Sequence, residues 1–243
     1  MQDILTIQGI TKQFGGLTAL RDVHASVKEG GRLGIIGPNG AGKTTLFNCI
    51  TGEFKPTTGA IQFRGEAIDG LKPHQISKKG IGRTFQIVRV FDALSVFENV
   101  LTGATSHELR LIPTEEQRHE VEEILRLTHL DKQRDVLGKN LTVAAKKRVG
   151  IATALATKPK LLLLDEAMAG LNFVEIDEAL QLLRKLNDDM GITLVVVEHV
   201  MKVVMELCEK IVVISSGEKI AEGSPREVSE NKKVIDVYLG ESH

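Results

Sequence analysis

Residues 37–44 read GPNGAGKT, a spacing of glycines, lysine and threonine that could hold the phosphates of a nucleotide. The pattern is G-x-x-x-x-G-K-[ST], in which glycines allow backbone N–H groups to close around phosphate oxygens. Lys43 would pair with the β- and γ-phosphates, while the hydroxyl of Thr44 would ligate Mg²⁺. The residues expected to contact the nucleotide here are Gly37, Pro38, Asn39, Gly40, Ala41, Gly42, Lys43, Thr44 and Thr45.

The surroundings of this loop support the same chemistry. An apolar run at residues 33–36 precedes it, and a helical pattern at residues 45–51 follows it. A strand before and a helix after place the loop at a helix N-terminus, where partial positive charge favours anions. A glycine turn without function is the alternative, and this context argues against it. The segment predicts a nucleoside triphosphate site with a divalent ion.

Two carboxylates, Asp165 and Glu166, follow a leucine run at residues 161–164. Alone, such a pair is more often a solvated turn or a helix cap than a catalytic site. The phosphate loop upstream reverses that balance, because the strand ends of an open parallel sheet point to the ligand crevice. We therefore expect Asp165 to hold Mg²⁺ through water and Glu166 to polarise the attacking water.

Short apolar and β-branched runs along the chain predict the strands that must position these residues. Several are apolar throughout, which indicates burial on both faces and a parallel sheet. Helical patterns between them supply the right-handed crossovers, so the fold class is α/β. The predicted strands are residues 4–10, 23–27, 33–36, 60–63, 81–85, 161–164, 193–197 and 211–214.

The stretch from residue 87 to residue 158 differs, because it shows helical periodicity and no convincing strand. Within it, residues 115–128 carry an apolar stripe, with Thr114 and Gln117 as a capping pair. We interpret residues 87–158 as a helical subdomain inserted into a single domain of residues 1–243. The core would then comprise residues 1–86 and 159–243, and two short helices would follow residue 225.

The composition excludes several classes of protein. A net charge of −1, from 31 basic and 32 acidic side chains, with no Trp and one Tyr, argues against a nucleic-acid partner. The N-terminal residues lack the pattern of a secretory signal, and no apolar run approaches the ~18 residues of a membrane span. Cys49 and Cys208 lack metal-ligand spacing, so we expect inert small hydrophobes. Any membrane association is expected to come through a partner.

Over essentially its whole length, the chain resembles the ATP-binding subunit of an ABC transporter. Gln86, after the predicted strand 81–85, resembles the Q-loop glutamine that contacts Mg²⁺ where the transmembrane partner docks. His199, after residues 193–197, resembles the switch histidine at the γ-phosphate. Phe14 resembles the aromatic residue that stacks on adenine. The D-loop is matched by Ala169, Gly170, Leu171 and Asn172.

Each of these matches has an ordinary alternative when taken alone. Gln86 could be a surface polar residue, His199 a helix cap and Phe14 a core residue. Their shared order, on both sides of the helical segment, is what favours the functional interpretation.

The resemblance implies an ATPase that uses ATP and Mg²⁺. Its fold would be a P-loop ABC ATPase with a mostly parallel core sheet, an N-terminal antiparallel β portion and an inserted helical subdomain. The catalytic residues would be Lys43, Gln86, Glu166 and His199. The nucleotide contacts beyond residues 37–45 would be Phe14, Gln86, Asp165 and His199, and the Mg²⁺ ligands would be Thr44, Gln86 and Asp165.

The chain departs from the family at its signature motif. L-S-G-G-Q aligns with Leu141, Thr142, Val143, Ala144 and Ala145. In the family this segment opens a helix that closes onto the γ-phosphate held by the other subunit. The added Cβ atoms of Val143 and Ala144 restrict close approach to a phosphate, although an ordinary first helical turn tolerates them. The basic residues 146–148 that follow are expected to form a solvated helix face.

Two smaller departures are Ala167 in place of the usual proline and Asn172 in place of the D-loop aspartate. Neither removes a phosphate or metal ligand. The residues that the chain contributes to its own nucleotide site are complete, whereas the signature segment that it contributes to a partner's site is degenerate. This asymmetry favours a heterodimer with a second ABC ATPase over a homodimer.

Within the family, four segments resemble the branched-chain amino acid importer type: residues 14–16, 83–86, 169–172 and 238–241. The resemblance implies transmembrane permease subunits as partners, a substrate-binding protein acting indirectly, and a peripheral location on the cytoplasmic face of the membrane. Two alternatives stay open: a nucleotide-responsive binding module with little hydrolysis, and a soluble ABC protein outside transport. Intact Glu166 and His199 disfavour the first, and one phosphate loop without sustained heptads disfavours the second.

Overall fold

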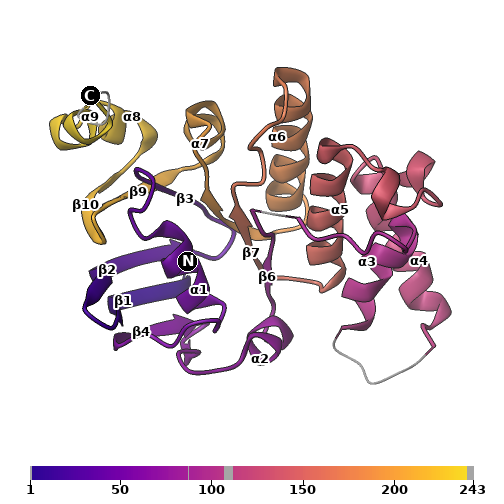
Figure 1. Cartoon of the computed structure of the whole chain (residues 1–243), viewed down its shortest axis with the longest axis horizontal. Helices are drawn as coiled ribbons and strands as arrows, with labels where there is room; N and C mark the ends of the chain where they lie inside the picture. The colour runs from indigo at the N-terminus through magenta and orange to yellow at the C-terminus, as the bar shows by residue number, and fades with distance from the viewer. Residues whose placement is uncertain (1, 87, 107–111, 240–243) are drawn as a thin grey trace.

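Two β-sheets and a group of helices make up the computed structural model, which describes residues 2–86, 88–106 and 112–239 (Figure 1). The larger sheet has six strands in the order β10-β9-β3-β8-β7-β6. All neighbours in it are parallel except β10, which runs antiparallel to β9. Its strands are β3 (Arg32–Ile36), β6 (Ile81–Arg83), β7 (Leu161–Asp165), β8 (Thr193–Val197), β9 (Lys210–Ser215) and β10 (Glu218–Gly223).

The smaller sheet is antiparallel, with strand order β2-β1-β4-β5. Its strands are β1 (Asp3–Phe14), β2 (Leu17–Lys28), β4 (Thr58–Phe63) and β5 (Glu66–Ala67). This is the N-terminal antiparallel portion expected beside a mostly parallel core sheet.

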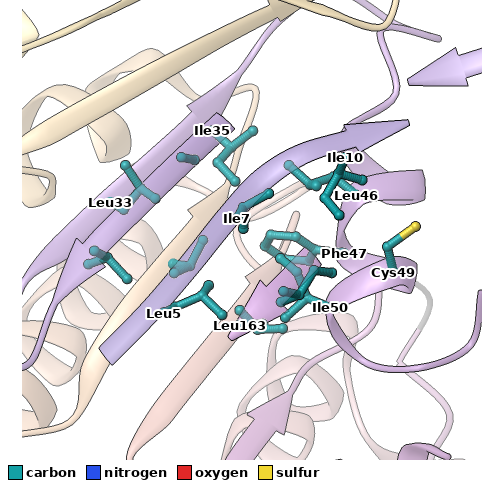
Figure 2. Packing of buried hydrophobic residues seen from close by; sticks show 14 of the residues in the cluster. Leu5, Ile7, Ile10, Leu33, Ile35, Leu46, Phe47, Cys49, Ile50 and Leu163 are labelled. Carbon is teal, nitrogen blue, oxygen red and sulfur yellow. The ribbon is translucent and has the colours of Figure 1, made fainter. Parts of the chain in front are cut away.

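Burial on both faces explains the continuous apolar strands. All five residues of β7 are buried, and its four leucines alternate between two hydrophobic clusters. Leu163 packs with α1 (Lys43–Ile50) and the antiparallel sheet, where Figure 2 shows it near Phe47 and Ile50. Leu164 packs in the other cluster with Leu183 of α6 (Phe173–Asp188). Each fully buried leucine contributes about 1.5–3 kcal/mol, so the strand that ends in Asp165 is firmly held.

The helical segment has a hydrophobic cluster of its own. Figure 1 shows α3 (Val96–Thr105), α4 (Glu115–Leu127) and α5 (Val143–Ala156) together at one end of the molecule. Val100, Val121 and Val149, one from each helix, are buried in this cluster. The described part of residues 88–158 contains helices, including short 3-10 turns at Asp131–Gln133 and Gly138–Asn140, but no strand. The separate cluster supports the division of the chain at residues 86 and 159, which stays a prediction.

The remaining helices lie outside that group. They are α2 (Pro73–Lys78), α7 (Met201–Leu207), α8 (Pro225–Ser229) and α9 (Lys232–Leu239). The predicted cap of α4 is confirmed, because Thr114 Oγ1 accepts from the Gln117 N–H and the Gln117 side chain accepts from the Thr114 N–H. The two short C-terminal helices are confirmed as well. Gly240 and Glu241, from the C-terminal match, lie outside the described residues.

Several strand predictions need correction, and the two-residue strand β5 was not predicted. The strand predicted at residues 81–85 ends at Arg83, because after one more ladder hydrogen bond from the Thr84 N–H the chain leaves the sheet and Phe85 is exposed. The first two strands are longer than predicted and form a hairpin through residues 15–16. Strand β10 was not predicted, because its sequence EKIAEG is mostly polar and lies at the sheet edge.

Among the described residues, no helix combines the length and apolarity that crossing a membrane requires.

Candidate nucleotide-binding site

The phosphate loop connects the end of β3 to the start of α1, and two of its glycines are required by geometry. Gly42 has φ 104°, and a Cβ there would lie 2.6 Å from the carbonyl oxygen of Ala19. At Gly37, with φ 151°, a Cβ would lie 1.9 Å from the carbonyl oxygen of Ile214. Any side chain at either position would displace backbone, so the loop conformation depends on glycine.

Lys43 is buried and folds back over this loop. Its Nζ donates to the carbonyl oxygens of Gly37 at 2.6 Å and Pro38 at 2.8 Å. The ammonium group therefore lies inside the loop and beside the N-terminus of α1. A phosphate entering this loop meets one full positive charge together with the partial charge of the helix end.

A crevice of about 620 Å³ lies above the loop. It brings together side chains from segments far apart in the sequence, including most of those predicted to bind nucleotide. The predicted residues that line it are Phe14, Asn39, Gly40, Ala41, Gly42, Lys43, Thr44, Thr45, Gln86, Glu166 and His199. Asp165 lines a neighbouring cavity of about 760 Å³, which shares Thr44 and Gln86 with the crevice.

Glu166 is held between two side chains at the wall of the crevice. Gln86 Nε2 donates to Glu166 Oε2 at 2.6 Å, and His199 Nε2 lies 2.9 Å from Glu166 Oε1. The backbone of Glu166 has φ 49°, a left-handed conformation that is uncommon outside glycine. Such strain at a carboxylate in a crevice is typical of functional sites.

Lys147 on α5 reaches the backbone of the same residue. Its Nζ donates to the carbonyl oxygen of Glu166 at 3.0 Å, and burial lowers the pKa of the ammonium group. The prediction that residues 146–148 form a solvated face is therefore wrong for Lys147. The helix turns this side chain toward the core, whereas Lys146 and Arg148 are partly exposed beside Asp92 and Glu178.

Glu198, next to His199, is a buried carboxyl group that sequence reasoning missed. Its Oε1 accepts from the N–H of Met168 at 2.7 Å, and its Oε2 has no hydrogen-bond partner among the described residues. Burial raises the pKa of Glu198 to about 7. The sequence feature that could have identified Glu198 is its position directly after the buried strand β8.

Asp165 is buried and paired with an arginine that was not predicted as a site residue. Arg83 Nη2 donates to Asp165 Oδ2 at 2.7 Å. Asp165 Oδ1 is buried without a hydrogen-bond partner in the described part of the chain. Thr44, Gln86 and Asp165 offer hydroxyl, amide and carboxylate oxygens around one cavity, which is the donor set that Mg²⁺ prefers. The orphaned Oδ1 leaves one carboxylate oxygen of Asp165 available for such an ion.

Phe14 stands at the rim of the crevice with 41% of its surface exposed. Its ring meets that of Phe54 edge to face, at 5.1 Å between centroids, and Lys12 Nζ lies 4.8 Å from the Phe14 centroid. These contacts hold an exposed aromatic ring where a base could stack.

The signature and D-loop segments do not line the chain's own crevice. Thr142 caps α5 by accepting from the N–H of Ala145, and Val143 follows in an ordinary helical turn with 64% of its surface exposed. Asn172 caps α6 by accepting from the N–H of Glu175 at 3.0 Å. Asparagine therefore serves as the cap at the position where the family usually has aspartate.

Comparison with known proteins decides the family. The family model described as "ABC transporter" matches residues 20–169. The chain belongs to the ABC transporter family. A second family model, described as "Branched-chain amino acid ATP-binding cassette transporter", matches residues 218–243. Membership of the ABC transporter family makes the chain an ATP-binding subunit whose ATPase activity is coupled to transport.

Relatives along the whole length agree with this assignment. The chain is 39% identical over 255 residues to the high-affinity branched-chain amino acid transport ATP-binding protein BraF of Pseudomonas aeruginosa, covering 98% of each chain. The crystal structure of the ADP conformation of MJ1267, an ATP-binding cassette of an ABC transporter, matches with a TM-score of 0.90 and 31% identity, covering 99% of this chain and 100% of that chain. The dimeric structure of MJ0796, a bacterial ABC transporter cassette, matches with a TM-score of 0.83 and 30% identity, covering 91% of this chain and 99% of that chain.

Proposed function

We propose that this ABC transporter subunit hydrolyses ATP with Mg²⁺ and thereby drives a membrane importer for branched-chain or related amino acids. The observation that carries the catalytic part is the placement of Glu166 between Gln86 and His199 at the wall of the phosphate-loop crevice. The similarity to BraF over nearly the whole chain supports the substrate class.

Binding follows from the residues around the crevice. The adenine would stack on Phe14, and the phosphates would lie in the loop of residues 37–45 at the N-terminus of α1. Lys43 would exchange its bonds to the loop carbonyls for bonds to phosphate oxygens. Thr44, Gln86 and Asp165 would hold Mg²⁺, which when bound neutralises charge on the phosphates.

Hydrolysis would require Glu166 to orient the attacking water. In the structure its two oxygens are occupied by Gln86 and His199. For the reaction, at least one of these contacts must give way to the water, and His199 is then free to donate to the γ-phosphate. Gln86 lines both cavities, so its movement would couple the state of the nucleotide to the helical subdomain.

We propose that the second ATPase in the dimer is a different subunit. Val143 and Ala144 occupy the positions where the family has glycines, so the signature helix approaches a partner's phosphate less closely. The chain's own crevice keeps the phosphate loop and Glu166. A partner with the usual signature would therefore complete this chain's site and leave the second site weaker.

The transmembrane permease would dock on the cytoplasmic side of the membrane, beside the cavity of about 760 Å³. Phe85 and Phe91 line that cavity and are more than half exposed. Exposed aromatic residues around a concave surface are typical of a protein interface.

Reconstitution tests the proposal. The chain, its permease subunits and the second ATPase would be placed in proteoliposomes, with phosphate release and leucine uptake measured together. We expect ATP-dependent uptake, loss of both signals with Lys43→Ala, and loss of phosphate release with retained ATP binding for Glu166→Gln. ATP binding without any phosphate release by the wild-type complex would instead favour a nucleotide-responsive module.

A further inference from the structure

The side chain of Arg83, the last residue of β6, is 8% exposed and lies between β7 and α1. Its Nη2 donates to Asp165 Oδ2 at 2.7 Å, on the neighbouring strand β7. Its Nη1 donates to Asn48 Oδ1 of α1 at 2.7 Å and to Oγ1 of Thr51, the C-cap residue of that helix, at 3.1 Å. One guanidinium group thus connects the strand that carries Asp165 with the helix that begins at the phosphate loop.

Two aromatic rings lie beside this guanidinium. Its central carbon lies 4.9 Å from the ring centroid of Phe85 and 5.7 Å from that of Phe47. Arginine presents several donors in a rigid fork and stacks on aromatic faces, whereas lysine offers a single flexible ammonium group. The contacts of Arg83 therefore use properties that only arginine has.

The helix face to which Arg83 donates hydrogen bonds also carries a predicted Mg²⁺ ligand. Thr44 and Asn48 of α1 and its C-cap residue Thr51 are spaced by four and three residues, so they lie on the same side of the helix. All three line the same cavity as Arg83 and Asp165. By binding Asn48 and Thr51, Arg83 ties the carboxylate of Asp165 to the helix face that presents Thr44.

The ion pair also determines which carboxylate oxygen is available. Oδ2 of Asp165 is occupied by Arg83, while the buried Oδ1 has no hydrogen-bond partner among the described residues. A buried carboxylate without a cation is costly, so the guanidinium of Arg83 compensates the charge of Asp165, and its bond to Oδ2 fixes the orientation of the carboxylate. One oxygen is anchored and the other is ready for a metal ion or its water.

We propose that Arg83 is a positioning residue for magnesium, acting through Asp165. The proposal rests on the function proposed above, because it requires that Asp165 serve the ion. Hydrogen-bond partners of metal-binding carboxylates commonly tune metal affinity, and their loss typically costs about 10–100-fold. We therefore expect the loss of Arg83 to weaken the use of Mg²⁺ much more than the binding of the nucleotide itself.

The test measures metal dependence apart from hydrolysis. ATP binding to the full-length chain would be titrated by calorimetry in EDTA and at a series of Mg²⁺ concentrations. Mn²⁺ bound with ATP would be followed by electron paramagnetic resonance. For Arg83→Met we expect ATP affinity in EDTA within about twofold of wild type, and a rise of about 10–100-fold in the half-saturating Mg²⁺ concentration. Arg83→Lys should recover part of this loss.

Arg32→Met is the matched control. Arg32 is also largely buried and paired with two carboxylates, Asp188 and Glu209, but it lies at the first residue of β3, away from the crevice. Its loss should leave the Mg²⁺ titration unchanged. If Arg83→Met does not fold, Asn48→Ala removes one anchor of the guanidinium, and a rise of at least about threefold is expected.

Two negative outcomes have different meanings. If wild-type ATP binding responds to Mg²⁺ but Arg83→Met, or Asn48→Ala in its place, gives the same titration and the same Mn²⁺ spectrum, the positioning role is wrong. If ATP binding by the wild-type chain is indifferent to Mg²⁺, the proposed magnesium site fails, and the role of Arg83 fails with it.

Discussion

The imidazole Nε2 of His199 lies 2.9 Å from Oε1 of Glu166, although 33 positions separate the two residues in the sequence. The contact forms because β7 and β8 are adjacent parallel strands, in which Asp165 is paired with Val197. Residues that follow the two strands therefore emerge side by side at the same edge of the sheet. The arrangement joins the residue proposed to orient water with the residue proposed to meet the γ-phosphate.

Removing either member of this pair should slow hydrolysis without abolishing ATP binding. For Glu166→Gln we expect phosphate release to fall by at least about 100-fold, because general-base contributions are typically of that size or larger. His199→Ala should reduce the rate by a similar factor if the two act as one unit. Phosphate release and ATP calorimetry on the reconstituted complex check this, with the surface substitution Glu178→Gln as control. Unchanged turnover for Glu166→Gln would contradict the assignment.

Gly42→Ala should destabilise the phosphate loop more than Gly40→Ala. Gly42 combines φ 104° with a Cβ position 2.6 Å from the Ala19 carbonyl oxygen, whereas Gly40, at φ 76°, has open space around it. We expect a loss of about 2–5 kcal/mol in the free energy of unfolding for Gly42→Ala and about 1 kcal/mol for Gly40→Ala. Urea unfolding of both variants measures the difference, and equal losses would argue against the packing explanation.

Lys147→Met should lower the turnover number while leaving ATP affinity unchanged. The ammonium group supports the backbone of Glu166 from outside the crevice, so its loss moves the carboxylate rather than the nucleotide. Because small displacements of a catalytic group are costly, we expect about a tenfold fall in kcat. Lys146→Met is the control, since Lys146 is only partly buried and lies 3.8 Å from Asp92. A rise in KM with constant kcat would refute this role.

The buried carboxyl of Glu198 should make stability fall as pH rises. Its pKa is raised to about 7 in the folded chain, so between pH 4.5 and 7 the folded state holds a proton that the unfolded state has lost. Its contribution is present below pH 4.5 and is lost as the pH passes 7. Lys147 and Glu166 are the charged groups that act on it.

Replacing this carboxyl with a neutral amide tests the prediction. We expect the free energy of unfolding of Glu198→Gln, compared with that of wild type, to rise by on the order of 1–3 kcal/mol between pH 5 and pH 8. Urea unfolding at the two pH values measures this, and the exposed Glu230→Gln is the control. An identical pH dependence in wild type and Glu198→Gln would show that the carboxyl is not protonated in the fold.

Restoring glycines in the signature segment should increase ATP hydrolysis at the partner's site. With this chain's own site silenced by Glu166→Gln, the substitutions Val143→Gly and Ala144→Gly would remove the Cβ atoms that restrict approach to the partner's phosphate. We expect phosphate release from the mixed dimer to rise severalfold, at a cost to helix α5 of about 1–2 kcal/mol. No change in release would indicate that the altered signature does not limit the second site.

Local features of the sequence predicted the phosphate loop, the leucine strand before Asp165 and Glu166, and the cap of α4. Each depends on residues close together in the chain: glycines at positions that demand positive φ, side chains of one buried strand, and a threonine three residues before a glutamine. Short-range sterics and hydrogen bonding determine such features, so spacing alone reveals them.

The tertiary structure alone decided the contacts between these segments. Arg83 meets Asp165 across 82 positions, and Lys147 turns inward to Glu166 although its neighbours in a basic run are partly exposed. Strand order, register and the rotation of α5 set these distances, and they are properties of the packed core as a whole. A charge in the sequence does not indicate whether it will meet solvent or a buried partner, because that depends on which elements cover it.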